Sequence, residues 1–237
     1  MSPPVAIITG AGRGIGRATA LELAKAGYQV ALVARSTAEL RQTAELCAAA
    51  HAGETSVESA DVCDAAAIAS IVERTDGRWG RVDAFIHCAG MAPLIAIDQM
   101  TDEQWRGTVD TNLSAAFHFC RALWPVWRRQ GGGVGVLVSS LAARDPFNGF
   151  AAYAAAKAGV NMLGMALARE GAAIGVRMHV VAPGAVETRM FRDLFTPQQF
   201  PAEKALAPAD VAGVIVQCVR GDLRYSSGEV IYVHKTM

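Results

Sequence analysis

The chain has 237 residues, 52% of them hydrophobic, and its 22 Lys+Arg balance 22 Asp+Glu. This length fits one large domain, and a balanced charge lacks the field that attracts nucleic acid or an anionic membrane surface. No apolar run approaches the ~20 residues of a membrane-spanning helix, and the N-terminus has no signal-peptide pattern. We therefore expect one cytoplasmic domain with no nucleic-acid or membrane partner.

The first predicted elements are a buried strand at residues 5–8, a glycine-rich turn and a helix at residues 17–26. A strand–turn–helix unit places a helix N-terminus against a pyrophosphate, and the missing Cβ atoms let phosphate approach the backbone. A purely structural turn is the alternative. The spacing is TGxxxGxG and not GxGxxG, and the candidate cofactor residues are Thr9, Gly10, Gly12, Arg13, Gly14, Ile15 and Gly16.

The second strand, at residues 29–34, ends at Arg35 without the carboxylate that many dinucleotide sites use to bind the adenosine ribose. Arg13 in the glycine turn is a second cation near the same point. Two cations and no acid indicate a 2′-phosphate, so the sequence favours NADP(H) and leaves NAD(H) as the alternative. The competing interpretation is that both arginines are solvated surface residues.

A helix at residues 37–50, a strand at 55–60, a helix at 65–75 and a strand at 82–87 follow. Asp61 and Val62 end the third strand, where an acid can accept from the adenine amino group or cap the next helix. Ala89 and Gly90 follow the fourth strand, and a glycine there lets backbone lie flat against a ligand. His87 stands without a triad partner and is interpreted as structural.

A loop at residues 91–100 leads into one long helix that starts near Thr101 and carries apolar residues at helical spacing. Asn112 interrupts this pattern. Its side chain competes for backbone hydrogen bonds, so a buried asparagine in mid-helix needs a reason. A surface or kink asparagine is the alternative.

Residues 131–135 are expected to form a flexible turn into a strand at 136–140, whose Ser140 lies at the sheet edge that binds ligands. The next helix presents Tyr153 and Lys157 one turn apart on one face. A strand at 176–181, Pro183-Gly184, an apolar loop from Thr188 to residue 208, a helix at 209–219 and a strand at 230–233 complete the chain. The alternation predicts an α/β Rossmann fold, a parallel sheet of about seven strands with helices on both faces.

These motifs, in this order, resemble the short-chain dehydrogenase/reductase family over nearly the whole chain, most closely its 3-oxoacyl-(acyl-carrier-protein) reductase-like branch. The resemblance rests on Thr9-Gly10…Gly14-Ile15-Gly16, Asp61-Val62, Ala89-Gly90, Asn112, Ser140, Tyr153-x-x-x-Lys157 and Pro183-Gly184…Thr188. Ser140 precedes Tyr153 by thirteen positions, as in the family pattern, which selects it over Ser139.

The resemblance implies hydride transfer between a nicotinamide and a carbonyl, with Tyr153 as general acid. Lys157 is then expected to lower the pKa of Tyr153 and to hold the nicotinamide ribose, because a nearby ammonium favours the phenolate. Ser140 orients the carbonyl oxygen, and Asn112 binds a water that relays protons to Lys157. The segment 188–208 is the expected substrate lid.

Two departures from the family pattern stand out. His87-Cys88 replaces two asparagines, which puts the bracing of the sheet in doubt, and His234-Lys235-Thr236-Met237 replaces the usual C-terminal Asp-Gly-Gly near subunit contacts. Arg128-Arg129 either receive an acidic carrier protein or complement the dipole at a helix end. Apolar residues on the long helices (Trp124, Trp127, Met162 and Met165), together with the family resemblance, favour a homodimer or homotetramer.

The sequence thus favours an NADPH-dependent reductase of a small-molecule carbonyl, with an acyl-carrier-protein-linked 3-oxoacyl thioester as one candidate substrate. A dehydrogenase that oxidises a steroid-like, sugar or polyol alcohol is the second interpretation, and a non-catalytic cofactor-binding regulator is the third. The five cysteines are odd in number, scattered and without a CxxC pair, which indicates reduced thiols and no metal site.

Overall fold

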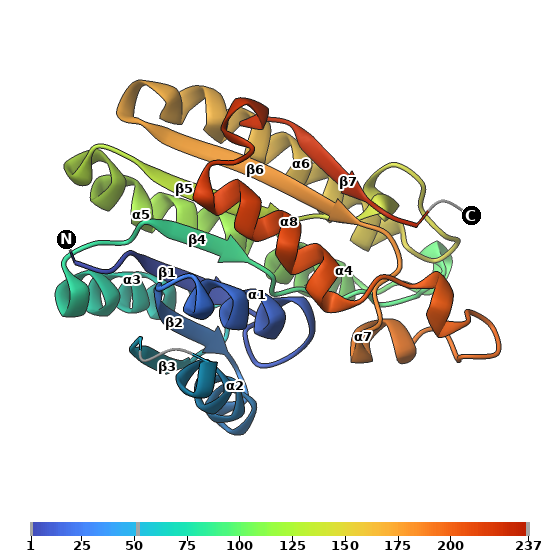
Figure 1. The fold of residues 1–237 in the computed structure, drawn as a ribbon. Helices are drawn as coiled ribbons and strands as arrows, with labels where there is room; N and C mark the ends of the chain where they lie inside the picture. Colours follow the sequence, from blue (N-terminus) through green and yellow to red (C-terminus); the bar gives the residue numbers. More distant parts are fainter. Residues whose placement is uncertain (1, 51–52, 236–237) are drawn as a thin grey trace.

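A parallel sheet forms the centre of the molecule in the computed structural model, which describes residues 2–50 and 53–235 (Figure 1). Within these residues seven strands pair in the order β3-β2-β1-β4-β5-β6-β7, and every neighbouring pair is parallel. The predicted fold class is confirmed. The strands are β1 (Val5–Thr9), β2 (Gln29–Ala34), β3 (Thr55–Ser59), β4 (Ala84–His87), β5 (Gly133–Val138), β6 (Val176–Pro183) and β7 (Val230–Val233).

Helices cover both faces of the sheet. Helix α1 packs against α2 and α8 on one face, whereas α3 packs against α5 and α4 against α6 on the other. The helices are α1 (Gly14–Lys25), α2 (Thr37–Ala50), α3 (Ala65–Trp79), α4 (Asp102–Val109), α5 (Ala115–Gln130), α6 (Ala151–Gly171), α7 (Arg189–Arg192) and α8 (Pro208–Arg220).

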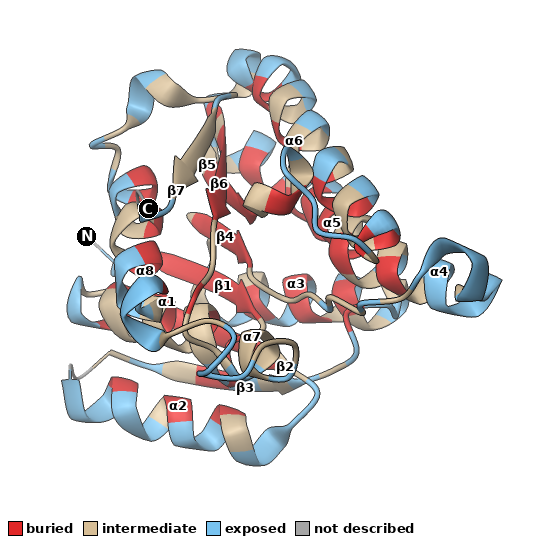
Figure 2. Ribbon diagram, turned by 90° about the vertical axis from the view of Figure 1, so that its right-hand side faces the viewer, coloured by how far each residue is buried: buried red, intermediate tan, exposed pale blue. Residues whose placement is uncertain are grey.

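The strands are apolar because each central one is buried on both faces. All five residues of β1 are buried, and so are all four of β4. Figure 2 shows the buried residues concentrated in the strands and on the helix faces that meet them. Two apolar clusters result, one between the sheet and α1, α2 and α8, the other between the sheet and α3, α5 and α6.

The long helix expected from near residue 101 is present as one continuous helical run over residues 102–130, but it contains a π-helical segment that the sequence pattern did not predict. Helices α4 and α5 are separated by a π-helical stretch, η2 (Asp110–Ser114), and Asn112 lies in it and is fully buried. Short π-helical segments frequently occur at functional sites. The polar residue that breaks the apolar pattern therefore marks a change in the backbone.

The flexible turn expected at residues 131–135 is shorter than predicted, because β5 already begins at Gly133. A Cβ on Gly133 would lie 2.3 Å from Trp127, and one on Gly135 would lie 2.4 Å from Met178. Both glycines therefore make room for large side chains. Trp127 is fully buried and donates from Nε1 to the Val82 carbonyl at 3.0 Å, so it belongs to the core and not to an exposed apolar face.

Thr9 and His87 brace the centre of the sheet. The Thr9 hydroxyl accepts from the amides of Cys88 and Ala89, each at 3.1 Å, and lies 3.0 Å from Nδ1 of His87. Both of its lone pairs are then used, so the hydroxyl hydrogen is donated to the ring. Burial lowers the pKa of His87 to about 3, so the ring is the neutral acceptor that this bond needs. The bracing left in doubt by the sequence is provided by His87.

We predict that Thr9→Val lowers the free energy of unfolding by about 2–4 kcal/mol, because it leaves the two partly buried amides of Cys88 and Ala89 without this acceptor and removes the bond to His87. Urea denaturation measures the change. Thr19→Val is the matched control, since Thr19 is equally buried and its hydroxyl accepts from no backbone amide among the described residues. Equal losses in the two variants would contradict the proposed brace.

Candidate active site

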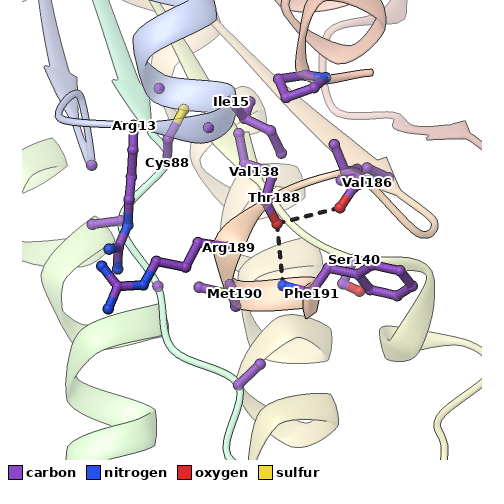
Figure 3. A pocket seen from close by; sticks show the side chains of 18 of the residues that line it. Arg13, Ile15, Cys88, Val138, Ser140, Val186, Thr188, Arg189, Met190 and Phe191 are labelled. Carbon is purple, nitrogen blue, oxygen red and sulfur yellow. Dashed lines mark hydrogen bonds between the residues drawn. The ribbon is translucent and has the colours of Figure 1, made fainter. Parts of the chain in front are cut away.

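One cavity of about 1460 Å³ lies at the carboxyl ends of the central strands. It lies beside the paired strands β1 and β4, from which the chain continues in opposite directions, to β2 on one side and to β5 on the other. Ligands of open α/β sheets bind at such a point. Figure 3 shows its lining contributed by the glycine turn, by the ends of β4 and β5, and by the segment around α7.

The glycine turn is packed so closely that side chains are excluded. A Cβ on Gly16 would lie 2.3 Å from the Gly10 carbonyl oxygen, and one on Gly10 would lie 2.9 Å from the backbone of Cys88 and Ala89. Gly10 and Gly14 also have positive φ angles, 64° and 56°. Helix α1 therefore begins inside the turn at Gly14 and points its unpaired amides at the cavity, where they favour an anion.

The predicted cofactor residues line this cavity with one exception. Thr9 does not, because it is fully buried and its hydroxyl is used within the sheet. Its expected cofactor contact is therefore wrong and its role is structural. The residues that do line it are Gly10, Gly12, Arg13, Gly14, Ile15, Gly16, Arg35, Asp61, Val62, Ala89, Gly90, Tyr153, Lys157, Pro183, Gly184 and Thr188, together with Asn112 and Ser140.

Asn112 and Lys157 are buried side by side below Gly90. The Asn112 amide donates from Nδ2 to the carbonyls of Met91 and Thr108, both at 2.8 Å, while its Oδ1 has no partner among the described residues. A Cβ on Gly90 would lie 2.7 Å from this Oδ1 and 3.6 Å from the Lys157 Nζ. An orphaned acceptor beside an ammonium, at the wall of a cavity, is a place for a polar ligand or water.

Lys157 is held on β5. Its Nζ donates to the Val138 carbonyl at 2.8 Å, and its own carbonyl accepts from the Ser139 hydroxyl at 3.1 Å. Burial lowers the pKa of Lys157 to about 8. Ser139 is thus occupied in holding the helix, which leaves Ser140 to face the cavity, as the sequence spacing predicts.

Ser140 and Tyr153 meet at the substrate end of the cavity. The Ser140 hydroxyl accepts from the Ala142 amide at 3.1 Å and interacts with the phenol of Tyr153. Burial raises the pKa of Tyr153, and the Ser140 interaction opposes this only in part. The expected lowering by Lys157 is wrong in this structure, because its Nζ bonds to Val138 and lies 5.7 Å from the centre of the tyrosine ring.

Asp61 lies exposed at the opposite end of the cavity, near Arg35. Its Oδ1 accepts from the Cys63 amide at 2.9 Å. The alternative role as a helix cap belongs to Asp64, which accepts from the amides of Ala66 and Ala67. Asp61 is therefore available to a ligand through its second carboxylate oxygen.

The segment 188–208 covers one side of the cavity and is closed at its base by a bridge between Val186 and Leu206. The Thr188 hydroxyl accepts from the Phe191 amide at 3.3 Å and starts α7 (Figure 3). Packed aromatic rings then continue from Phe191 to Phe195, with ring centroids 5.2 Å apart, and from Phe195 to Phe147, with ring centroids 5.5 Å apart. The segment is thus an ordered apolar wall.

Several cavity residues escape sequence reasoning. Glu39 of α2 lies 3.5 Å from the Arg13 guanidinium, although the sequence shows no acid at the end of β2. Arg189 projects into the cavity from α7 (Figure 3). Phe147 and Phe150 continue the packed aromatic rings to Tyr153, with 5.8 Å between the two phenylalanines and 5.3 Å to the tyrosine. Of these residues only Glu39 has a position that the sequence could have indicated, because an acid in the first turn of the helix after β2 lies close to the end of that strand.

Comparison with known proteins agrees with this geometry. The family described as short chain dehydrogenase matches residues 4–199. The chain belongs to the short-chain dehydrogenase family. It is 32% identical to 3-oxoacyl-[acyl-carrier-protein] reductase of Escherichia coli K12, over 98% of this chain and 96% of that protein. It is 36% identical to 2,3-dihydro-2,3-dihydroxybenzoate dehydrogenase of the same organism, over 79% of this chain and 71% of that protein.

Solved structures show the same fold. A short-chain type dehydrogenase/reductase from Mycobacterium ulcerans superposes with a TM-score of 0.92 at 27% identity, covering 98% of this chain and 89% of that one. The resemblance stated from the sequence is confirmed. This short-chain dehydrogenase is therefore an oxidoreductase of a nicotinamide-dependent family.

Two further features of this short-chain dehydrogenase concern partners and metals. Arg129, in the last turn of α5, donates to Asp76 of α3 at 2.6 Å. Among the described residues, none of the helices has the length and apolar character to cross a membrane, and no group of His, Cys, Asp and Glu side chains is arranged to hold a metal ion.

We predict that Gly16→Ala weakens binding of the reduced nicotinamide cofactor about tenfold or more, because its Cβ would force the Gly10 carbonyl, and with it the glycine turn, to move. Titration of the cofactor fluorescence measures the dissociation constant. Gly213→Ala in α8 is the control, since nothing lies within 4 Å of its added Cβ. The control is expected to keep its affinity and to gain about 0.5–1 kcal/mol of stability. Unchanged cofactor affinity in Gly16→Ala would contradict the role of the closely packed glycine turn, the glycine cradle, in cofactor binding.

Proposed function

We propose that this chain is an NADPH-dependent reductase that converts a small-molecule carbonyl to an alcohol. The observation that carries the proposal is the convergence of Ser140, Tyr153, Lys157 and Asn112 on the cavity that also contains the glycine cradle. A 3-oxoacyl thioester is the substrate class to test first, since a relative from Escherichia coli is named for that reaction.

The residues fit a dinucleotide. The close packing of Gly10 and Gly16 holds the start of α1 at the cavity, where its unpaired amides would bind a pyrophosphate, and Thr188 of the facing segment lies across the turn with its methyl group against Gly14. Lys157 and the orphaned Oδ1 of Asn112 form the polar end next to Gly90, where the nicotinamide ribose is expected. When bound, the cofactor supplies the hydride.

Tyr153 supports reduction as the working direction. Because burial raises its pKa, the phenol is protonated at neutral pH and can give its proton to a carbonyl oxygen. The Ser140 hydroxyl lies beside it and orients that oxygen. A general acid has to hold its proton before the reaction, and this environment secures that state.

Lys157 and Asn112 supply the proton path behind Tyr153. The ammonium binds the ribose hydroxyls, and Oδ1 of Asn112 holds a water that carries a proton to Lys157. The buried acceptor without a partner and its position beside Nζ support this arrangement. A buried polar atom without a hydrogen-bond partner costs free energy, so the unpaired Oδ1 of Asn112 favours a role in binding a ligand or water over a role in packing.

Arg13 and Arg35 support NADP(H) as the preferred cofactor. Both line the end of the cavity next to β2, and guanidinium groups recognise phosphate by paired hydrogen bonds. NAD(H) remains the alternative cofactor.

The apolar segment 188–208 is proposed as the substrate lid. Its phenylalanines and Leu194 line the cavity, so a closed lid would exclude water from the reacting carbonyl. A dehydrogenase that oxidises an alcohol is the alternative function, and the relative named for 2,3-dihydro-2,3-dihydroxybenzoate oxidation lends it support.

A homodimer or homotetramer in the cytoplasm is the proposed working form. Phe117 of α5 and Met162 of α6 are 42% and 61% exposed, which leaves apolar surface on these helices for a second copy. All five cysteines are free thiols, as is usual in a reducing compartment. Sedimentation analysis determines the oligomeric state.

We predict that the wild-type protein oxidises NADPH in the presence of acetoacetyl-coenzyme A and that Tyr153→Phe lowers kcat at least about 100-fold, since the phenylalanine has no proton to donate. The absorbance of NADPH measures the rate, and NADH serves as the comparison. Cofactor binding by the variant shows that its site is intact. Turnover by Tyr153→Phe at the wild-type rate would refute the assigned acid, whereas binding without turnover in the wild type redirects the search to other carbonyls.

We predict that kcat/KM for reduction is constant below pH 7 and falls above about pH 8. The pKa of Lys157 is lowered to about 8, so its ammonium is present below that pH and lost above it. Tyr153 is not the source of this decline, because its pKa is raised above the usual value of a phenol. Initial rates across the pH range measure the profile.

Lys157→Arg tests the assignment, because a guanidinium keeps its charge throughout this pH range. Its residual activity is expected to be independent of pH between 7 and about 9. A decline with the same midpoint in this variant would show that another group titrates.

A further inference from the structure

The adenosine end of the cavity contains a carboxylate that the glycine turn and β2 do not supply. Glu39 of α2 is a third exposed, and its Oε1 lies 3.5 Å from Nη1 of Arg13. The side chain also lies against the glycine turn, because a Cβ on Gly12 would come within 3.0 Å of the Glu39 Cβ and 3.1 Å of its Oε2. The acid is therefore part of the cavity wall.

The backbone of Glu39 is fixed in this position. Its carbonyl accepts from the Thr43 hydroxyl at 3.1 Å and from the Arg17 guanidinium at 3.4 Å, and its amide donates to the Ser36 hydroxyl at 3.3 Å. Arg17 and Thr43 also bond to the carbonyls of Gly12 and Ala11. The first turn of α2 is thus tied to the glycine turn through its backbone, whereas the Glu39 carboxylate is held by the Arg13 ion pair.

The charges around Glu39 are mostly positive. Arg13 pairs with Glu39, and no other carboxylate of the described residues lies within salt-bridge distance of Arg13. Arg35 lines the same end of the cavity, and Figure 3 shows Arg189 directed from α7 toward Arg13. A ligand phosphate that enters this end of the cavity therefore meets several arginines. The guanidinium of Arg13 is already paired with the Glu39 carboxylate.

We propose that Glu39 determines the preference between NADP(H) and NAD(H), by competing with the adenosine 2′-phosphate for Arg13. The proposal rests on the dinucleotide binding inferred above. With NADP(H), the phosphate takes over the Arg13 guanidinium and the carboxylate turns away, at the cost of the ion pair. With NAD(H), the pair persists and the carboxylate accepts from the ribose 2′-hydroxyl. Glu39 is therefore a specificity-determining residue that moderates the NADP(H) preference set by Arg13 and Arg35.

The test is the pair of dissociation constants for NADPH and NADH, measured by fluorescence titration of the purified protein without substrate. In Glu39→Gln the ratio of the NADH constant to the NADPH constant is expected to rise about 3- to 10-fold over wild type, the range that a half-exposed ion pair supplies. Calorimetry with 2′,5′-ADP and 5′-AMP repeats the comparison with ligands that lack the nicotinamide. The first ligand should gain affinity and the second should not.

Glu45→Gln is the matched control. Glu45 is exposed on the same helix and does not line the cavity, so this variant changes the net charge equally without changing the site. Arg13→Met tests the route of the effect. If Glu39 acts through Arg13, the additional change Glu39→Gln should shift the ratio less than twofold in the Arg13→Met background.

The two proposals fail in different ways. Tighter binding of NADH than of NADPH by the wild type would refute the NADP(H) preference, yet a rise of the ratio in Glu39→Gln would still support the role of Glu39. Equal ratios in wild type, Glu39→Gln and Glu45→Gln would refute the role of Glu39. An equal shift in both glutamine variants would refute it as well, because net charge alone would then explain the change.

Discussion

Gly16 lies so close to the Gly10 carbonyl that no side chain fits between them, and a side chain on Gly10 would likewise collide with the backbone that leaves β4. These backbone contacts bring the start of α1 and the ends of β1 and β4 to one point. The amides of α1 then face the cavity, and the residues after β4 and β5 lie opposite them. The position of the proposed pyrophosphate contacts depends on this packing, which explains why the turn is made of glycine.

Buried polar groups organise the chemistry at the other end of the cavity. Lys157 has its Nζ on the carbonyl at the end of β5, and Ser139 holds the carbonyl of Lys157 in turn. Asn112 is placed beside Nζ by the π-helical stretch that separates α4 from α5. Each of these groups bonds to a backbone carbonyl, so the polar end of the cavity is tied directly to the sheet and to the helices beside it.

At the adenosine end of the cavity, Arg17 joins α2 to the glycine turn, and Arg13 faces the cavity. The two guanidinium groups serve different purposes, since Arg17 donates to protein acceptors and Arg13 has the Glu39 carboxylate as its one ion-pair partner among the described residues. The site is thus electrostatically adjustable at one end and rigid at the other. That division suits a protein that has to bind one of two similar dinucleotides and then perform one reaction.

The sequence by itself determined the fold class and most of the glycine-turn, catalytic and lid residues that were expected at the cavity. Apolar runs of strand length alternate with helical patterns, and glycines, Ser140, Tyr153 and Lys157 stand at strand ends and on one helix face, where local spacing decides what they meet. Only the tertiary structure decided the rest. Thr9 became a brace because β4 lies beside β1, and Lys157 turned to Val138 because β5 offers a carbonyl. Glu39 reached Arg13 because α2 folds against the glycine turn, and contacts between segments so far apart leave no periodic signal in the sequence.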